Sequence, residues 1–177
     1  MGELSDKKVL TAKVRFDYKF PISQWFFNMD CTYRNTKSNS ITSQVVTDNM
    51  IAYVDVPRLH SADKFTSSVS AVKRFHSIGT KLSLSLQYSW SRQQVMQNAS
   101  LIGTTSESLA IIPSVISKPF DCLEFSYEGQ MRKASSKYLA TRRSLWQQDH
   151  SLKFILSPWK TFLVHVGSDI AKRDINL

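Results

Sequence analysis

The stretch KLSLSLQYSW, residues 81–90, decides the fold class of this chain. Its apolar side chains occupy every second position, and Lys, Ser or Gln fills the positions between them. A period of two is typical of a β-strand with one apolar and one polar face, because successive side chains of a strand point to opposite sides. The apolar face of such a strand meets a second sheet in a soluble sandwich, and it meets lipid in a membrane barrel. The remainder of the chain has to decide between these two folds.

The same alternation recurs along the chain, whereas helical periodicity is hard to find. It predicts an all-β, up-and-down antiparallel meander of roughly eight strands in four hairpins, at about residues 9–35, 62–92, 105–132 and 148–171. The turns within the hairpins are short, and the links between the hairpins are long and polar, at about residues 35–62, 93–104 and 132–148. We expect these links to be loops. The longest link alternates around residues 45–56, which predicts a strand extension that projects above the sheet.

The composition allows one domain and argues against a nucleic-acid partner. The chain has 177 residues, 42% of them apolar, and 23 Lys and Arg against 14 Asp and Glu give a formal charge of +9. A nucleic-acid interface requires clustered basic residues, but here at most two basic residues are adjacent. The sequence contains no apolar stretch of about eighteen residues and no signal-peptide core. A protein exported to an outer membrane would therefore have to be longer than this sequence.

Residue types that catalyse reactions or bind metals are present without a recognisable pattern. The four histidines have no companion ligand at a metal-binding spacing, and no nucleophile elbow, phosphate loop or dinucleotide fingerprint occurs. Cys31 and Cys122 fall within alternating segments, and we interpret them as small buried apolar residues. We expect no enzyme, no cofactor and no metal site, although a Ser–His–Asp triad assembled in space stays an open alternative.

Two further features favour the membrane barrel over the soluble sandwich. Long links strictly alternate with short turns, and aromatic residues gather beside the short turns and again toward the far ends of the strands. A bilayer imposes this arrangement on a sheet, because each of its interfaces holds a girdle of aromatic side chains. In such a barrel the following apolar positions meet lipid: Val14, Phe16, Tyr18, Trp25, Phe27, Leu82, Leu84, Leu86, Tyr88, Phe125, Tyr127, Phe162 and Val164. The following polar positions face the lumen: Lys13, Arg15, Asp17, Lys19, Ser83, Ser85, Gln87, Glu124 and Glu128.

The phrasing of four stretches resembles the barrel of a known family, the TonB-dependent receptor-like outer-membrane proteins of Bacteroidetes. The stretches are RFDYKFPISQWFFNMDCTYR (15–34), DNMIAYVDVPRLHSADKFTSSVSAVKRF (48–75), LSLSLQYSWSRQQVMQNA (82–99) and SLKFILSPWKTFLVHV (151–166). In that family a carboxypeptidase-regulatory-like domain and a plug precede a barrel of about twenty or more strands. Neither preceding domain is found in this sequence, and its end, KRDINL, lacks the terminal aromatic residue of a completed outer-membrane barrel.

The resemblance therefore implies that residues 1–177 are a fragment of the barrel, a partial transmembrane domain without a plug, in the bacterial outer membrane. The implied function is nutrient uptake. The implied partners are outer-membrane lipid, the remaining strands and the plug of the parent barrel, and TonB through that plug. The alternative is a small stand-alone β-barrel or a soluble β-domain that binds a ligand.

Overall fold

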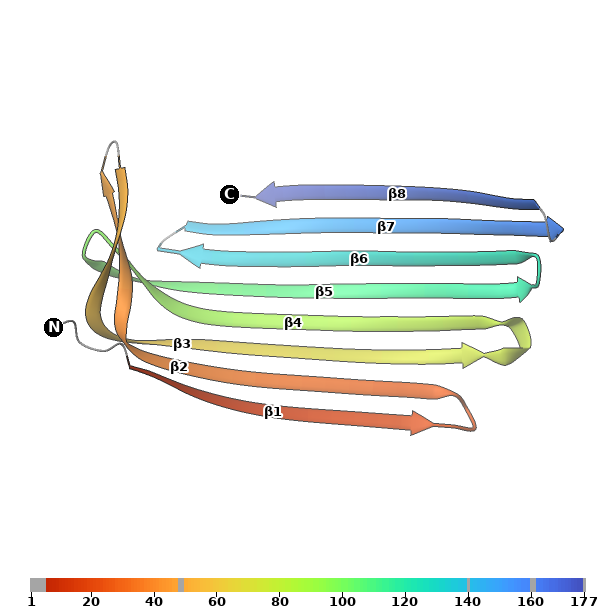
Figure 1. Cartoon of the computed structure of the whole chain (residues 1–177), viewed down its shortest axis with the longest axis horizontal. Coiled ribbons are helices and arrows are strands. Elements are labelled where there is room, and N and C mark those ends of the chain that lie inside the picture. The colour runs from red at the N-terminus through yellow and green to blue at the C-terminus, as the bar shows by residue number, and fades with distance from the viewer. Residues whose placement is uncertain (1–5, 48–49, 140, 160–161, 177) are drawn as a thin grey trace.

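The chain folds into one antiparallel sheet of eight strands in sequential order (Figure 1). The computed structural model describes residues 6–47, 50–139, 141–159 and 162–176. The strands are β1 Lys7–Phe20, β2 Trp25–Thr47, β3 Met50–Phe75, β4 Thr80–Gln97, β5 Ser100–Phe120, β6 Leu123–Tyr138, β7 Thr141–Trp159 and β8 Phe162–Asn176. Each strand pairs with the next, which confirms the predicted all-β, up-and-down antiparallel meander.

The strand ends fall on two sides of the sheet, which we call the turn end and the arm end. At the turn end, Pro21 follows β1 directly, where its ring removes a backbone donor that a continuing ladder would need. The 3-10 turn η1 (His76–Ile78) connects β3 to β4 and ends at Gly79, which has a φ of 57°. A Cβ at this glycine would also collide with the carbonyl oxygen of Lys118, so both the backbone conformation and the close approach require glycine. No helix within the described part of the chain is long and apolar enough to cross a membrane.

The prediction that the three polar links are loops is wrong, whereas the strand extension predicted around residues 45–56 is confirmed for residues 45–47 and 50–56. At the arm end, the strands stay paired to the last register pairs Thr47–Met50, Gln97–Ser100 and Tyr138–Thr141. The four hairpins cover residues 7–47, 50–97, 100–138 and 141–176 rather than 9–35, 62–92, 105–132 and 148–171. Polar and apolar residues mix on both faces of these extensions, so the alternation weakens, but the backbone ladder does not depend on side-chain polarity. Asn98 and Ala99 reverse the chain with φ values of 47° and 62°, which Asn tolerates better than most residues.

Two further expectations at the turn end need correction. The sequence predicts turns at residues 118–121 and 157–159, but residues 118–120 extend β5 and residues 157–159 extend β7. The reversal after β7 falls on residues 160–161, outside the described residues. Cys122 is therefore exposed in a turn rather than buried in a strand. Cys31 lies half-buried in β2, with its sulfur 3.3 Å from Ser67 Oγ.

The register places most of the apolar positions of the strands on one face. Directly opposed residues point to the same side, and one such row contains Phe16, Met29, Val69, Leu86, Ile111 and Met131. The adjacent row, on the other face, contains Arg15, Asp30, Ser68, Gln87, Ala110 and Arg132. The two-residue period seen in residues 81–90 is thus kept in phase across the sheet.

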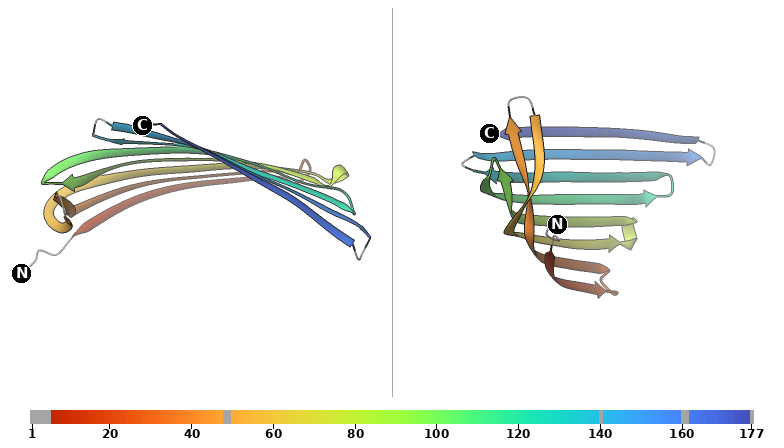
Figure 2. Two further views of the ribbon diagram at one scale, coloured as in Figure 1. Left: turned by 90° about the horizontal axis from the view of Figure 1, so that it is seen from above. Right: turned by 60° about the vertical axis from the view of Figure 1, so that its left-hand side comes forward.

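The sheet is a single curved layer, and its polar face is the hollowed one (Figure 2). At the arm end, a register shift between Ser38 and Ser40 lets β2 and β3 bend out of the sheet as an arm, residues 40–47 and 50–57. The arm returns toward β4, where β2 adds two parallel register pairs, Ser43–Met96 and Gln44–Gln97. Ile41, Ser43 and Met96 are buried at this contact. The arm is therefore held against the sheet by packing and by backbone pairing.

Candidate functional site

The apolar face is exposed over the width of the sheet. Phe16 in β1 is 51% exposed, Leu84 in β4 is 44% exposed, and Phe162 in β8 is 49% exposed. In the described part of the chain the sheet has no second layer that could cover this face. A continuous apolar surface of this extent is unusual on a protein in water and marks contact with another apolar medium or another protein.

The apolar residues form a band that is inclined to the rows of opposed residues. Phe20 is the last apolar residue of the band at the turn end of β1. The row of residues directly opposed to it ends at Ser168 in β8, after Trp25, Lys73, Leu82, Val115, Tyr127 and Leu152. In β8 the band instead reaches Phe162, six residues beyond Ser168 (168 − 162). The arm-end limit of the band shifts toward the turn end as well. The first charged residue beyond this limit is Arg92 in β4, Glu107 in β5 and Lys133 in β6, and each lies two residues nearer the turn end than the one before. Six residues over seven strand steps correspond to an inclination of about 30°.

Aromatic side chains line both edges of the band. At the turn end, the ring centroids of Tyr18 and Phe20 lie 4.1 Å apart, and those of Phe125 and Phe154 lie 4.9 Å apart. At the arm end, the centroids of Phe65 and Tyr88 lie 6.2 Å apart. In β4 the band runs from residue 82 to residue 90, which is about 27 Å along the strand and about 23 Å perpendicular to the band after the inclination is included. This height is close to that of the apolar band of outer-membrane barrels, which is about 25 Å tall.

Among the polar side chains on the apolar face, Lys73 and His150 both have partners. The Lys73 ammonium lies 5.2 Å from the Trp25 ring centroid and 5.5 Å from that of Phe75, and it donates a hydrogen bond to the Ser23 carbonyl in the turn. Its charge is thereby carried to the edge of the band, as long basic side chains do at membrane interfaces. His150 is hydrogen-bonded to the Tyr127 hydroxyl.

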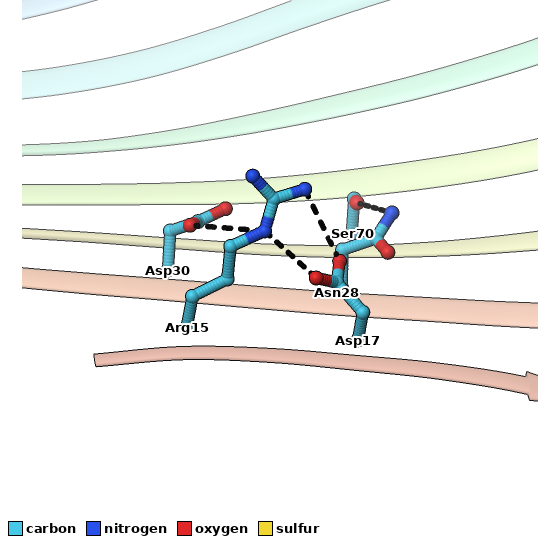
Figure 3. A network of polar contacts seen from close by, with 5 residues as sticks. All are labelled: Arg15, Asp17, Asn28, Asp30 and Ser70. Carbon is cyan, nitrogen blue, oxygen red and sulfur yellow. Dashed lines mark hydrogen bonds and ion pairs between the residues drawn. The ribbon is translucent and has the colours of Figure 1, made fainter.

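The polar face carries networks of charged groups and small hydroxyl side chains. Arg15 Nε lies 2.7 Å from Asp17 Oδ2 and 3.9 Å from Asp30 Oδ1, so one guanidinium bridges carboxylates of β1 and β2 (Figure 3). Across β4 and β5, the hydroxyls of Ser89 and Ser108 lie 3.0 Å apart. These contacts pair the polar groups with one another, and the face as a whole stays hydrophilic.

The structure separates the two sets of residues that the sequence predicted for lipid and lumen. The thirteen apolar positions from Val14 to Val164 share one face, and the nine polar positions from Lys13 to Glu128 share the opposite, concave face. No group of three or more His, Cys, Asp or Glu side chains is placed to hold a metal ion in the portion of the chain that the structure describes.

A hollow of about 770 Å³ lies on the polar face beneath the arm, and sequence reasoning missed it. Its lining is hydrophilic, with hydroxyl groups from Thr36, Ser38, Thr42 and Ser91. Four basic side chains and two carboxylates also line it: Lys7, Arg34, Lys64, Arg92, Asp55 and Asp63. Because these residues come from four strands, only the register and the bend of the arm bring them together.

No family model, no curated protein and no solved structure matches this chain.

Proposed function

We propose that the chain is a section of a transmembrane β-barrel in the bacterial outer membrane. The convex apolar face meets lipid, and the concave polar face lines the interior. The observation that carries this proposal is the exposed apolar band, about 23 Å tall and inclined by about 30° to the rows of opposed residues. A barrel requires tilted, staggered strands, and a flat bilayer then requires an apolar band that runs obliquely across them.

The unpaired edges of the sheet support a section of a larger barrel rather than a closed one. β1 and β8 each pair with one neighbour and not with each other in the described residues. Every residue of β1 is exposed. Unpaired backbone groups are costly in a bilayer, so β1 and β8 require further strands of the parent barrel.

Nutrient uptake is the activity that the family resemblance suggests for the parent. The section would supply part of the wall of a TonB-dependent receptor-like protein, whose plug would lie against the concave face and engage TonB. The alternative, a stand-alone barrel or soluble β-domain that binds a ligand, draws support from the hollow beneath the arm.

Adjacent cysteine probes test which face meets lipid. In a Cys31→Ser, Cys122→Ser background, Leu84→Cys and Ser85→Cys each receive an environment-sensitive fluorophore, and the full chain is placed in lipid–detergent bicelles. These neighbouring residues point to opposite faces. We expect brominated acyl chains to quench the probe at position 84, and aqueous iodide to quench the probe at position 85. Equal quenching by lipid at both positions would refute the proposal.

A further inference from the structure

The hollow beneath the arm contains positive charges that no carboxylate neutralises. Arg34 and Lys64 are directly opposed in the β2–β3 ladder, on the concave face, and Lys7 lines the same hollow. Like charges opposed in a ladder destabilise a sheet. Within the described ranges, none of these three side chains forms an ion pair or donates a hydrogen bond; the ion pairs present join Arg15 to Asp17 and Asp30, and Lys172 to Asp174.

The two carboxylates of the hollow are occupied by neutral donors. Asp55 accepts a hydrogen bond of 2.7 Å from Thr42. Asp63 accepts hydrogen bonds of 2.7 Å from Asn35 and 2.8 Å from Tyr33, both of which lie on the convex side with it. Both carboxylates line the hollow, but these hydrogen bonds tie them to neutral donors, and the opposed cations remain available to a ligand.

The wall of the hollow is fixed before any ligand arrives. Ile41 and Met96 are buried where the arm meets β4, and the Asn98 N–H donates to the Gln44 carbonyl at 3.0 Å. A volume of about 770 Å³ greatly exceeds that of a lone inorganic ion and lies in the range of sites for small molecules. The hydroxyl groups of Thr36, Ser38 and Ser91 supply donors and acceptors for a hydroxylated ligand.

We propose that this hollow binds a phosphate or sulfate group carried by a small hydroxylated molecule, with the charged group between Arg34 and Lys64. Arginine presents a planar fork of donors and lysine a compact charge, and together they suit a tetrahedral oxyanion. The site rests on the proposed function only for its place on the interior side of a barrel wall. Its chemistry depends on the hollow alone.

Titration calorimetry of the full chain in bicelles tests the site with three probes: glucose 6-phosphate, inorganic phosphate and glucose. We expect saturable binding of glucose 6-phosphate, weaker binding of inorganic phosphate and no binding of glucose. Lys64→Gln should weaken glucose 6-phosphate binding by about tenfold or more, because it removes one charge-assisted contact. Lys64→Arg keeps the charge and should retain binding.

Lys81→Gln is the matched control. Lys81 is also opposed to an arginine, Arg74, on the concave face, but this pair lies at the turn end, outside the hollow. We expect Lys81→Gln to bind as the native chain does, with all variants giving the native circular-dichroism spectrum. Equal weakening by Lys81→Gln, binding of inorganic phosphate alone, or no saturable binding would each overturn the site. Loss of lipid quenching at position 84 would instead reject the proposed function and leave this site standing.

Discussion

The hydroxyl oxygen of Tyr127 lies 2.9 Å from Nδ1 of His150, within the exposed apolar face. The two rings are stacked, with an interplanar angle of 15° and centroids 6.1 Å apart. Gly129, directly opposite His150, leaves the space that the Tyr127 side chain fills. The hydrogen bond satisfies an imidazole that would otherwise be unpaired where the proposed lipid begins.

Gly129→Ala should break this arrangement. A Cβ at this position would lie 2.7 Å from the Tyr127 hydroxyl and 3.3 Å from His150 Nδ1, so the tyrosine has to move and the hydrogen bond is lost. We expect the free energy of unfolding in bicelles to fall by about 1–3 kcal/mol, the cost of an unsatisfied polar group. Gly103→Ala is the control, because a Cβ there meets nothing within 4 Å. A similar loss at both glycines, measured by denaturant titration, would contradict this account.

Arginine substitutions at adjacent positions of β4 should differ strongly in cost. Leu86→Arg places a charge in the middle of the apolar band and should destabilise the chain in bicelles by about 2–4 kcal/mol. Ser85→Arg points to the concave face, where water solvates the charge, and should cost well under 1 kcal/mol, as for ordinary exposed substitutions. Unfolding midpoints of the two variants give the comparison. Equal destabilisation would mean that the two faces meet similar media.

Acid should remove a stabilising contribution of Asp63, which lies beyond the arm-end edge of the band. The hydrogen bond from Asn35, followed by that from Tyr33, lowers the pKa of the Asp63 carboxyl below its ordinary value. Because the pKa is lower in the folded chain than in the unfolded chain, the contribution is present at neutral pH and is lost progressively below about pH 4. Asp63→Asn should therefore reduce stability at pH 7 and show a smaller further loss on acidification. Unfolding midpoints between pH 7 and pH 3 test this, and parallel pH profiles for the two chains would contradict it.

The isolated chain should fail to form a heat-resistant monomer. β1 and β8 would both keep unpaired backbone groups, which invite edge-to-edge pairing between chains. We expect inclusion bodies on expression and, after refolding in detergent, assemblies of folded chains joined at these edges rather than a heat-modifiable monomer on a gel. A compact monomer that migrates differently before and after boiling would favour the stand-alone barrel.

The sequence predicted the strands and their faces wherever one face is apolar. In residues 81–90 the alternation assigns each side chain to the apolar or the polar face. The register of the sheet keeps the apolar positions from Val14 to Val164 on the same face. The prediction of loops failed at the arm end, where polar and apolar residues mix on both faces and the two-residue period weakens, although pairing continues to Thr47 and Gln97. The hollow was beyond sequence reasoning for a different reason. Arg34 and Lys64 are thirty positions apart in the chain, and only the register makes them opposed.

The inclination of the strands also determines how much of the circumference of a barrel these eight strands cover. With an inclination of about 30°, each strand adds about 5.5 Å to a circumference, so these eight strands cover about 44 Å. Rolled into a cylinder, they would enclose a bore about 14 Å across between backbones, which side chains fill. In a barrel of about twenty strands the circumference is about 110 Å, and the same eight strands form two fifths of a wall around a bore of about 35 Å. Only in the wider bore would the hollow between Arg34 and Lys64 open onto a space that a hydroxylated ligand can enter.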